Sequence, residues 1–300
     1  MSERRSRMQR QRTGRSIALT ERDIAIFRAL RRYRYLRSTY LHAWAGGASV
    51  TRFKERLGNL FHEGFLNRPE KQWEFADARN RPAVYELGDR ARAALQELDG
   101  EQTDQRTFLV NGAAKQFMHA LLICECLASI ELATLRRSGL RFIGWPEIRA
   151  RIPQSVERPE RLAFKETAII PDGLFGLGYE RAGRCTYRFF AVEVDRGTMP
   201  LTRRDDRQTS VMAKLRAYQS VTEERYHHHQ WGVPNLLVLV VTTCAHRSLE
   251  MVRLASEKGL GPHILFKAIE EWEMLSPCPG LLETPWERTS VPSLNIGESD

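Results

Sequence analysis

The chain has 300 residues, of which 42% are hydrophobic and 9% aromatic, which is enough apolar material for one large domain or two modest ones. This composition excludes an intrinsically disordered regulator, because such chains contain too few hydrophobic residues to bury a core. Lys and Arg number 46 against 37 Asp and Glu, so the formal net charge of +9 predicts an anionic partner, chiefly nucleic acid or an anionic membrane.

The chain carries no recognisable targeting or membrane signal. No apolar run approaches the ~20 residues that a membrane-spanning helix needs, so we expect no membrane partner. The arginine-rich start is not followed by an apolar stretch, which excludes a secretory signal. The five cysteines show no metal-type spacing and are expected to be reduced thiols, so the expected location is the cytoplasm.

The first elements predict a small helical domain behind a basic arm. Residues 1–16 are rich in arginine and predict a disordered arm. Thr20 is placed to cap a helix with an apolar stripe, and acidic residues fill the first turn of that helix. Further helices are expected over roughly 35–45, from Ser49 to Gly64, and over roughly 89–98, with strands near 65–68 and 84–87. Three helices and a two-stranded wing with a long basic tip predict a winged helix-turn-helix over residues 17–98.

The third helix is the expected recognition helix. Its apolar positions leave Thr51, Arg52 and Asn59 facing outward, and such helices present their N-terminal half to base edges in the major groove. The basic residues of the wing suit the phosphate backbone; they are Arg68, Lys71, Arg79 and Arg81. Double-stranded DNA is the expected partner. The alternative is a winged helix that contacts proteins and whose charges are solvated.

The second half of the chain predicts an α/β domain with a mixed sheet over residues 110–272, after a polar linker at 99–107. The expected elements are a helix at 112–137, strands near 140–143, 167–177 and 186–195, a helix at 206–222, a strand at 235–242, a helix at 246–258 and a strand at 263–267. The run at 235–242 is almost entirely apolar, which suits a central strand. Residues 276–300 are rich in Pro, Ser and Glu and predict a flexible tail.

Three acidic residues lie in the apolar segments of this second domain. Glu193 and Asp195 are two residues apart on an expected strand, so their side chains share a face. Asp172 joins them if the two strands form a hairpin. Clustered carboxylates repel one another unless a cation neutralises them, and such hard oxygen ligands suit Mg²⁺ or Mn²⁺. We therefore expect Asp172, Glu193 and Asp195 to be metal ligands in phosphodiester chemistry.

Lys214 lies within the buried stripe of the helix at 206–222, one turn before Tyr218. A buried ammonium group needs a partner, and the acidic strand ends offer one. Two interpretations remain open. Lys214 either acts as a catalytic residue with Asp172, Glu193 and Asp195 by neutralising a scissile phosphate or orienting water, or it covers the core with its stem and reaches solvent.

The pattern from about Leu19 to Tyr218 resembles the replication-relaxation family of plasmid and mobile-element proteins. The segments that carry this resemblance are Leu19-Thr20, Arg56-Leu57-Gly58-Asn59-Leu60, Gly64-Phe65-Leu66, Tyr85-Glu86-Leu87-Gly88, His119, Pro171-Asp172-Gly173, Glu193-Val194-Asp195-Arg196-Gly197-Thr198 and Lys214-Leu215-Arg216-Ala217-Tyr218. The resemblance implies a DNA-binding protein that acts in the replication, relaxation or transfer of a mobile element.

The second domain also resembles the PD-(D/E)xK nuclease superfamily, which holds a divalent metal between its two acids. Asp172 matches the first acid and Glu193 the second, whereas Asp195 stands where a lysine is expected. Lys214 is placed to replace that lysine from the following helix, as in some members of the superfamily. The resemblance implies a Mg²⁺-dependent DNA endonuclease or nickase.

A second function stays open beside the nuclease. In this alternative the chain is a non-enzymatic DNA-binding regulator, and its degenerate nuclease-like domain forms a homodimer or binds a replication protein or relaxase. The acids are then structural: Asp172 caps a turn, and Asp195 pairs with Arg196 or Arg203.

Overall fold

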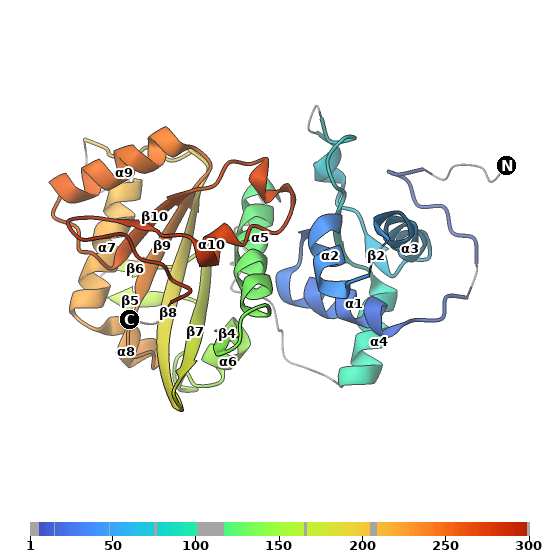
Figure 1. The fold of residues 1–300 in the computed structure, drawn as a ribbon, viewed down its shortest axis with the longest axis horizontal. Coiled ribbons are helices and arrows are strands. Elements are labelled where there is room, and N and C mark those ends of the chain that lie inside the picture. Colours follow the sequence, from blue (N-terminus) through green and yellow to red (C-terminus); the bar gives the residue numbers. More distant parts are fainter. Residues whose placement is uncertain are drawn as a thin grey trace. The chain divides into compact units, whose positions relative to one another are not determined.

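The computed structural model describes residues 6–14, 16–47, 49–74, 77–100, 117–164, 167–204 and 209–298. The chain forms two compact units, which are treated separately below (Figure 1). The described part of the first unit covers residues up to 100, together with 117–128 and Leu275–Pro277; the rest belongs to the second unit. The first five residues of the expected arm and most of the expected linker at 99–107 lie outside the described residues.

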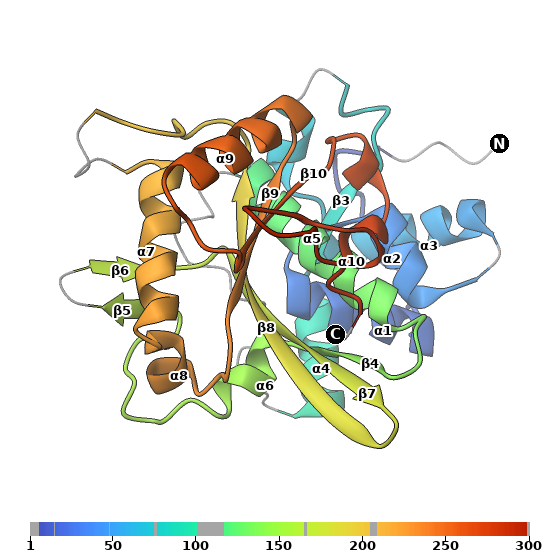
Figure 2. The ribbon, with the colours of Figure 1, turned by 60° about the vertical axis from the view of Figure 1, so that its left-hand side comes forward.

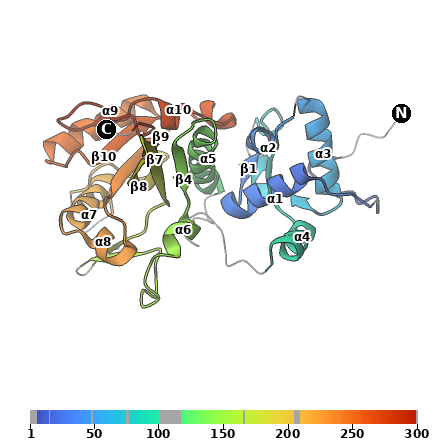
Figure 3. The same ribbon diagram turned by 60° about the horizontal axis from the view of Figure 1, so that its bottom comes forward.

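Helices and a small antiparallel sheet make up the first unit (Figure 3). Its elements up to residue 100 are α1 (Glu21–Tyr33), β1 (Leu36–Arg37), α2 (Ser38–Ala45), α3 (Val50–His62), β2 (Leu66–Asn67), the 3-10 helix η1 (Glu70–Glu74), β3 (Val84–Leu87) and α4 (Asp89–Asp99). The sheet has the order β1-β3-β2, so the expected two-stranded hairpin gains β1 as a third strand. Sequence pattern missed β1 because two residues show no alternation.

Side-chain caps explain where α1 and α3 begin. The backbone N–H of Asp23 donates to the Thr20 hydroxyl, and the Asp23 carboxylate accepts from the Thr20 backbone N–H at 2.8 Å. This reciprocal pair satisfies two donors that the first turn of a helix leaves free. Ser49 caps α3 with a single bond, accepting from the Arg52 N–H at 3.3 Å. Behind the caps, α1 buries Phe27 and Leu30.

Residues 6–14 of the expected disordered arm have no helix or strand, and two of their arginines contact the rest of the unit. Arg10 donates to the carbonyls of Phe61 at 2.9 Å and Leu66 at 2.8 Å. Arg7 donates to Arg81 O at 2.6 Å. A guanidinium carries five N–H donors and a carbonyl oxygen can accept a second bond, as Phe61 O does, which also accepts from the Gly64 N–H at 3.2 Å.

The second unit contains a mixed sheet flanked by helices (Figure 2). Helix α5 (Phe117–Thr134) belongs to the first unit up to Ala128 and to the second from Ser129. The elements that follow it are β4 (Leu140–Ile143), α6 (Trp145–Arg149), β5 (Leu162–Phe164), β6 (Thr167–Ile169), β7 (Gly173–Arg181), β8 (Arg184–Asp195), α7 (Val211–Glu223), α8 (Tyr226–Trp231), β9 (Leu237–Thr242), α9 (Ala245–Glu257), β10 (Ile264–Ala268), η3 (Glu273–Leu275), α10 (Gly280–Glu283) and β11 (Glu287–Arg288).

The six-stranded sheet has the order β11-β10-β9-β8-β7-β4. Strands β8, β9 and β10 are parallel, and the other pairs are antiparallel, as expected of a mixed sheet. Alternate residues of β8, from Phe189 through Ala191 to Glu193, face α7 and α9. The expected strand at 167–177 is divided: β6 pairs with β5 in a separate sheet, and β7 begins only after Pro171, which has no N–H for a ladder bond.

The C-terminal segment differs from the expected flexible tail. In residues 278–298, β11 pairs with β10, and Trp286 and Ile296 are fully buried. The Lys267 ammonium donates to Gly280 O and Thr284 O, both at 2.8 Å, and lies over the Trp286 ring. The Pro, Ser and Glu content of this segment is characteristic of mobile chain, but a few large apolar residues are enough to anchor it.

Helix α5 is long and apolar enough, by length and composition, to cross a membrane, with a mean hydropathy of 1.5 over its 18 residues. The expectation that no apolar run comes near this length therefore missed α5. Of that window, 94% is buried, which is how the core helix of a folded domain behaves.

Candidate functional site

Asp172, Glu193 and Lys214 come together in the second unit. Asp172 stands just before β7 and pairs with β8 on either side of Glu193. Its N–H donates to Val192 O at 3.0 Å, and its carboxylate accepts from the Val194 N–H at 2.9 Å. The hairpin of β7 and β8 thus brings the two acids together, as the sequence pattern predicts.

Both oxygens of the buried Glu193 carboxylate are bound by α7. The Tyr218 hydroxyl donates to Oε1 at 2.5 Å, and the Lys214 ammonium donates to Oε2. Lys214 and Tyr218 are four residues apart, so they share the face of α7 that covers β8. Ser210 caps this helix by accepting from the Ala213 N–H at 3.2 Å. The ammonium therefore binds the acid, and only 29% of the Lys214 side chain is exposed.

The surroundings of Glu193, Lys214 and Tyr218 raise the pKa of all three side chains. Burial raises the pKa of Glu193 to about 7; the charge of Lys214 opposes this shift, and that of Asp172 adds to it. Burial lowers the pKa of Lys214, but the attraction of Glu193 and Asp172 outweighs it, so the net shift is upward. Burial and Glu193 raise the pKa of Tyr218 well above its ordinary value. The phenol and the ammonium thus stay protonated donors near neutral pH.

Asp195 shares a face of β8 with Glu193 but contacts different groups. Arg247 of α9 donates from Nη2 to its Oδ1 at 2.9 Å, and the Gly197 N–H donates to its Oδ2 at 3.1 Å. Thr242 of β9 adds a longer bond at 3.3 Å. The sequence analysis predicted Arg196 or Arg203 as the structural partner of Asp195. The structure instead pairs Asp195 with Arg247, because α9 follows the neighbouring parallel strand β9.

These contacts bear on the expected metal site. Across the residues that the structure describes, no group of three or more His, Cys, Asp or Glu side chains is arranged to hold a metal ion. Mg²⁺ commonly uses one or two carboxylates and keeps several waters, so Asp172 and Glu193 fit such an ion if Glu193 shares its oxygens with Lys214 and Tyr218. The assignment of Asp172, Glu193 and Asp195 to Mg²⁺ or Mn²⁺ stays a prediction.

In the first unit, α3 presents a polar surface on its first two turns. Thr51 and Arg52 are exposed, and so is Lys54, which sequence reasoning missed although it continues the outward face. Asn59 is partly buried in the second half of the helix. On the opposite face of the helix, Leu57 and Leu60 are fully buried, so α3 packs against the rest of the unit on that side.

A groove of about 810 Å³ lies beside α3, between it and the start of α1. Its lining includes Arg22, Arg52 and Arg56. Arg56 is held by Asp23, with Nε and Oδ1 3.0 Å apart, and donates to Ala18 O at 2.7 Å. Arg22 and Arg52 are exposed, so their donors face the groove and solvent.

The four basic residues expected in the wing differ in their surroundings. Lys71 and Arg79 are exposed to solvent. Arg81 is partly buried and pairs with Asp77 at 2.7 Å. Arg68 is built into the fold: it donates to the Tyr85 hydroxyl at 2.7 Å, and its guanidinium lies 4.3 Å from the Phe61 ring centre. The role of all four in DNA binding stays a prediction, but the surroundings of Arg68 are those of a packing residue.

Comparison with known proteins gives one match. A family model described as Replication-relaxation matches residues 27–237, a span that includes α3 and the cluster of Asp172, Glu193 and Lys214. No curated protein and no solved structure matches the chain.

Proposed function

Because this chain belongs to the replication-relaxation family, we propose that it binds double-stranded DNA in the replication or relaxation of a mobile element. The order of α1, α2, α3 and the β1-β3-β2 sheet fits a winged helix-turn-helix in which α3 is the recognition helix. The observation that carries the proposal is the exposed start of α3, where Thr51, Arg52 and Lys54 face outward.

Each exposed group has a role suited to its chemistry. Arg52 and Thr51 reach base edges when the start of α3 enters the major groove, since arginine binds guanine through two parallel bonds. Lys54, Arg22 and the wing residue Arg79 contact phosphates, which adds affinity without sequence preference. The net charge of +9 draws the protein toward DNA over longer distances.

The test measures duplex binding by fluorescence anisotropy over a series of salt concentrations. We expect affinity to fall steeply with salt and Arg52→Ala to weaken binding roughly 5- to 150-fold, the range for the loss of a base-contacting arginine. Lys258→Ala, which removes one exposed positive charge in the second unit, is the matched control and should change affinity little. If the affinity for duplex DNA does not change with salt concentration, and Arg52→Ala binds as tightly as wild type, the result would instead favour a protein-binding winged helix.

A second candidate function is phosphodiester cleavage by the α/β unit. The meeting of Asp172, Glu193 and Lys214 at the β7–β8 hairpin favours it, because two acids and an ammonium group are the set that PD-(D/E)xK nucleases use. A bound Mg²⁺ or Mn²⁺ would supply Lewis-acid chemistry. The chain's own part is to hold the ion with Asp172 and Glu193 and to place the charge of Lys214 where negative charge develops.

Incubating the protein with a supercoiled plasmid and Mg²⁺ or Mn²⁺ distinguishes DNA cleavage from DNA binding without cleavage. Nicking that disappears in Glu193→Gln and in Lys214→Met, but persists in Asp89→Asn, a fully exposed acid of α4, supports cleavage. An intact plasmid with normal duplex binding supports the non-enzymatic regulator. Sedimentation of the full chain then shows whether the α/β unit forms a homodimer, and pull-down with a purified relaxase or replication protein tests the other partners.

A further inference from the structure

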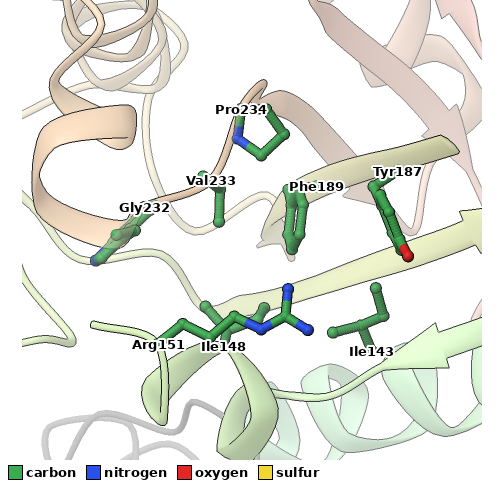
Figure 4. Close-up of a pocket in the computed structure, with 9 residues that line it drawn as sticks. Ile143, Ile148, Arg151, Tyr187, Phe189, Gly232, Val233 and Pro234 are labelled. Carbon is green, nitrogen blue, oxygen red and sulfur yellow. The ribbon is translucent and has the colours of Figure 1, made fainter. Parts of the chain in front are cut away.

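A pocket of about 210 Å³ opens in the second unit beside the first half of β8 (Figure 4). Its walls are apolar and mostly buried, and they come from β4, α6, β8 and the end of α8: Ile143, Ile148, Phe189, Trp231 and Val233. The Trp231 indole N–H already donates to Pro159 O at 2.7 Å, so the ring offers apolar contact. Phe189 precedes Glu193 by four residues, or roughly 13 Å along the strand, so this pocket is separate from the carboxylate cluster.

The loop after α8, from Gly232 to Pro234, lines one side of the pocket. Gly232 ends α8 in the left-handed conformation, with φ of 66°, and turns the chain toward Val233 and Pro234 at the pocket wall. Asn235 then ties the loop to β8: it accepts from the Phe189 N–H at 3.0 Å and donates to Tyr187 O at 2.8 Å. The opening is therefore held in place by hydrogen bonds to the sheet.

Arg151 supplies the charged group of the pocket. Figure 4 shows its guanidinium extending between Phe189 and Ile143. It donates to Glu147 at 3.2 Å, while Arg141 holds the same carboxylate with two bonds of 2.6 and 3.1 Å. Two cations thus share one acid, which leaves a net positive charge, and Arg151 keeps further donors for a ligand.

We propose that this pocket binds a small apolar carboxylate, with its apolar body between the buried walls and its carboxylate on Arg151. A carboxylate accepts two parallel bonds from a guanidinium, and Tyr187, 40% exposed at the rim, adds a hydroxyl. Apolar cavities of ~150 Å³ accept benzene, so the volume suits one ring with a short acidic arm. A nucleobase fits less well, because its amino groups need acceptors, and the described lining contains no side-chain carboxylate or amide.

Calorimetry on the full chain tests the proposal with phenylacetate and its neutral isostere phenylacetamide. We expect phenylacetate to bind with a Kd on the order of 0.1–1 mM, as suits a ligand of this size, and the amide to bind at least about 10-fold more weakly. Arg151→Met should abolish the preference for the acid. Arg149→Met, two residues earlier at the end of α6 and outside the lining, is the control and should keep it.

Two outcomes overturn the proposal: no saturable binding of phenylacetate, benzoate or hexanoate up to about 10 mM, the weak limit for a specific small ligand, or equal binding by wild type and Arg151→Met. A second arm identifies the source of the carboxylate. A peptide ending in phenylalanine that binds with a free carboxylate, but not when amidated, assigns the pocket to a peptide end; binding of the free acids alone assigns it to a small molecule. Neither result bears on DNA binding by α3.

Discussion

The hydroxyl of Tyr218 donates to Oε1 of Glu193 at 2.5 Å, from a helix that crosses over the strand carrying the acid. One turn earlier on the same face, Lys214 binds the other oxygen. The acid is therefore clamped by two donors from α7, and its position depends on how this helix packs as well as on the sheet. Tyr218 thus belongs with Asp172, Glu193 and Lys214, as a positioning residue for the acid.

Removing the Tyr218 hydroxyl should weaken the second unit. Tyr218→Phe keeps the ring but leaves a buried carboxylate oxygen without its donor, which costs about 1–3 kcal/mol in the free energy of unfolding. Urea unfolding followed by circular dichroism measures this loss. Tyr226→Phe, a partly exposed tyrosine of α8, is the control and should change stability by less than about 0.5 kcal/mol. Equal stability of both variants would show that the clamp contributes nothing.

The pH dependence of stability should report the Glu193 site. Its pKa is about 7 in the folded state against an ordinary value of 4.5. Between these values the folded state holds a proton that the unfolded state has lost, so the free energy of unfolding falls as pH rises through this window and levels off above it. The expected fall is on the order of 1–3 kcal/mol.

Glu193→Gln removes the titrating group, so its stability should change less between pH 5 and pH 8 than that of wild type. Parallel urea titrations of the two proteins at several pH values give the comparison. Wild-type stability that rises over this window would mean that Lys214 keeps the acid charged despite burial.

Asp195 should prove structural. Asp195→Asn weakens the bonds from Arg247, and we expect a loss of about 1–3 kcal/mol, because the Arg247 side chain is only 18% exposed. Arg247→Ala should cost a similar amount, and the double mutant should cost less than the sum, since both changes break one interaction. Mg²⁺ calorimetry on the same variants is decisive: a loss of metal binding in Asp195→Asn, with Arg247→Ala unaffected, would make Asp195 a ligand.

Two wing arginines should behave differently when removed. Arg68→Ala removes a guanidinium stacked on Phe61 and bonded to Tyr85, and should destabilise the first unit by about 1–2 kcal/mol. Arg79→Ala should leave stability within about 0.5 kcal/mol and lower the slope of log affinity against log salt by about one. Thermal unfolding and anisotropy measure both effects. Identical behaviour of the two variants would contradict this division.

The C-terminal segment should contribute strongly to stability. Trp286 is fully buried over Lys267, and Trp286→Ala should cost about 3–5 kcal/mol, as large-to-small changes in a core do. Trp272, which is 70% exposed, provides the matched control, and Trp272→Ala should cost less than about 0.5 kcal/mol. Chemical unfolding of the two variants tests whether residues 278–298 are part of the folded unit.

Short-range sequence patterns were sufficient to predict features that depend on residues close together in the chain. The caps at Thr20 and Ser49, the period of the apolar residues and the apolar run of β9 predict most of the helices and strands to within a few residues, since these features act over one or two turns. The pairing of Asp172 with the strand of Glu193 could also be predicted, because a hairpin joins segments that are near in sequence.

Contacts between distant segments could not be read from the chain alone. Nothing near Asp195 indicates that Arg247, 52 residues later, is its partner, and nothing in the composition of the C-terminal segment indicates the burial of Trp286. The sequence by itself determined most of the elements, the basic start of α3 and the family; the tertiary structure alone decided the partner of Asp195 and the burial of Trp286. The reason is physical: secondary structure follows from neighbours within a few residues, whereas the partner of a buried charge depends on which helix covers which strand.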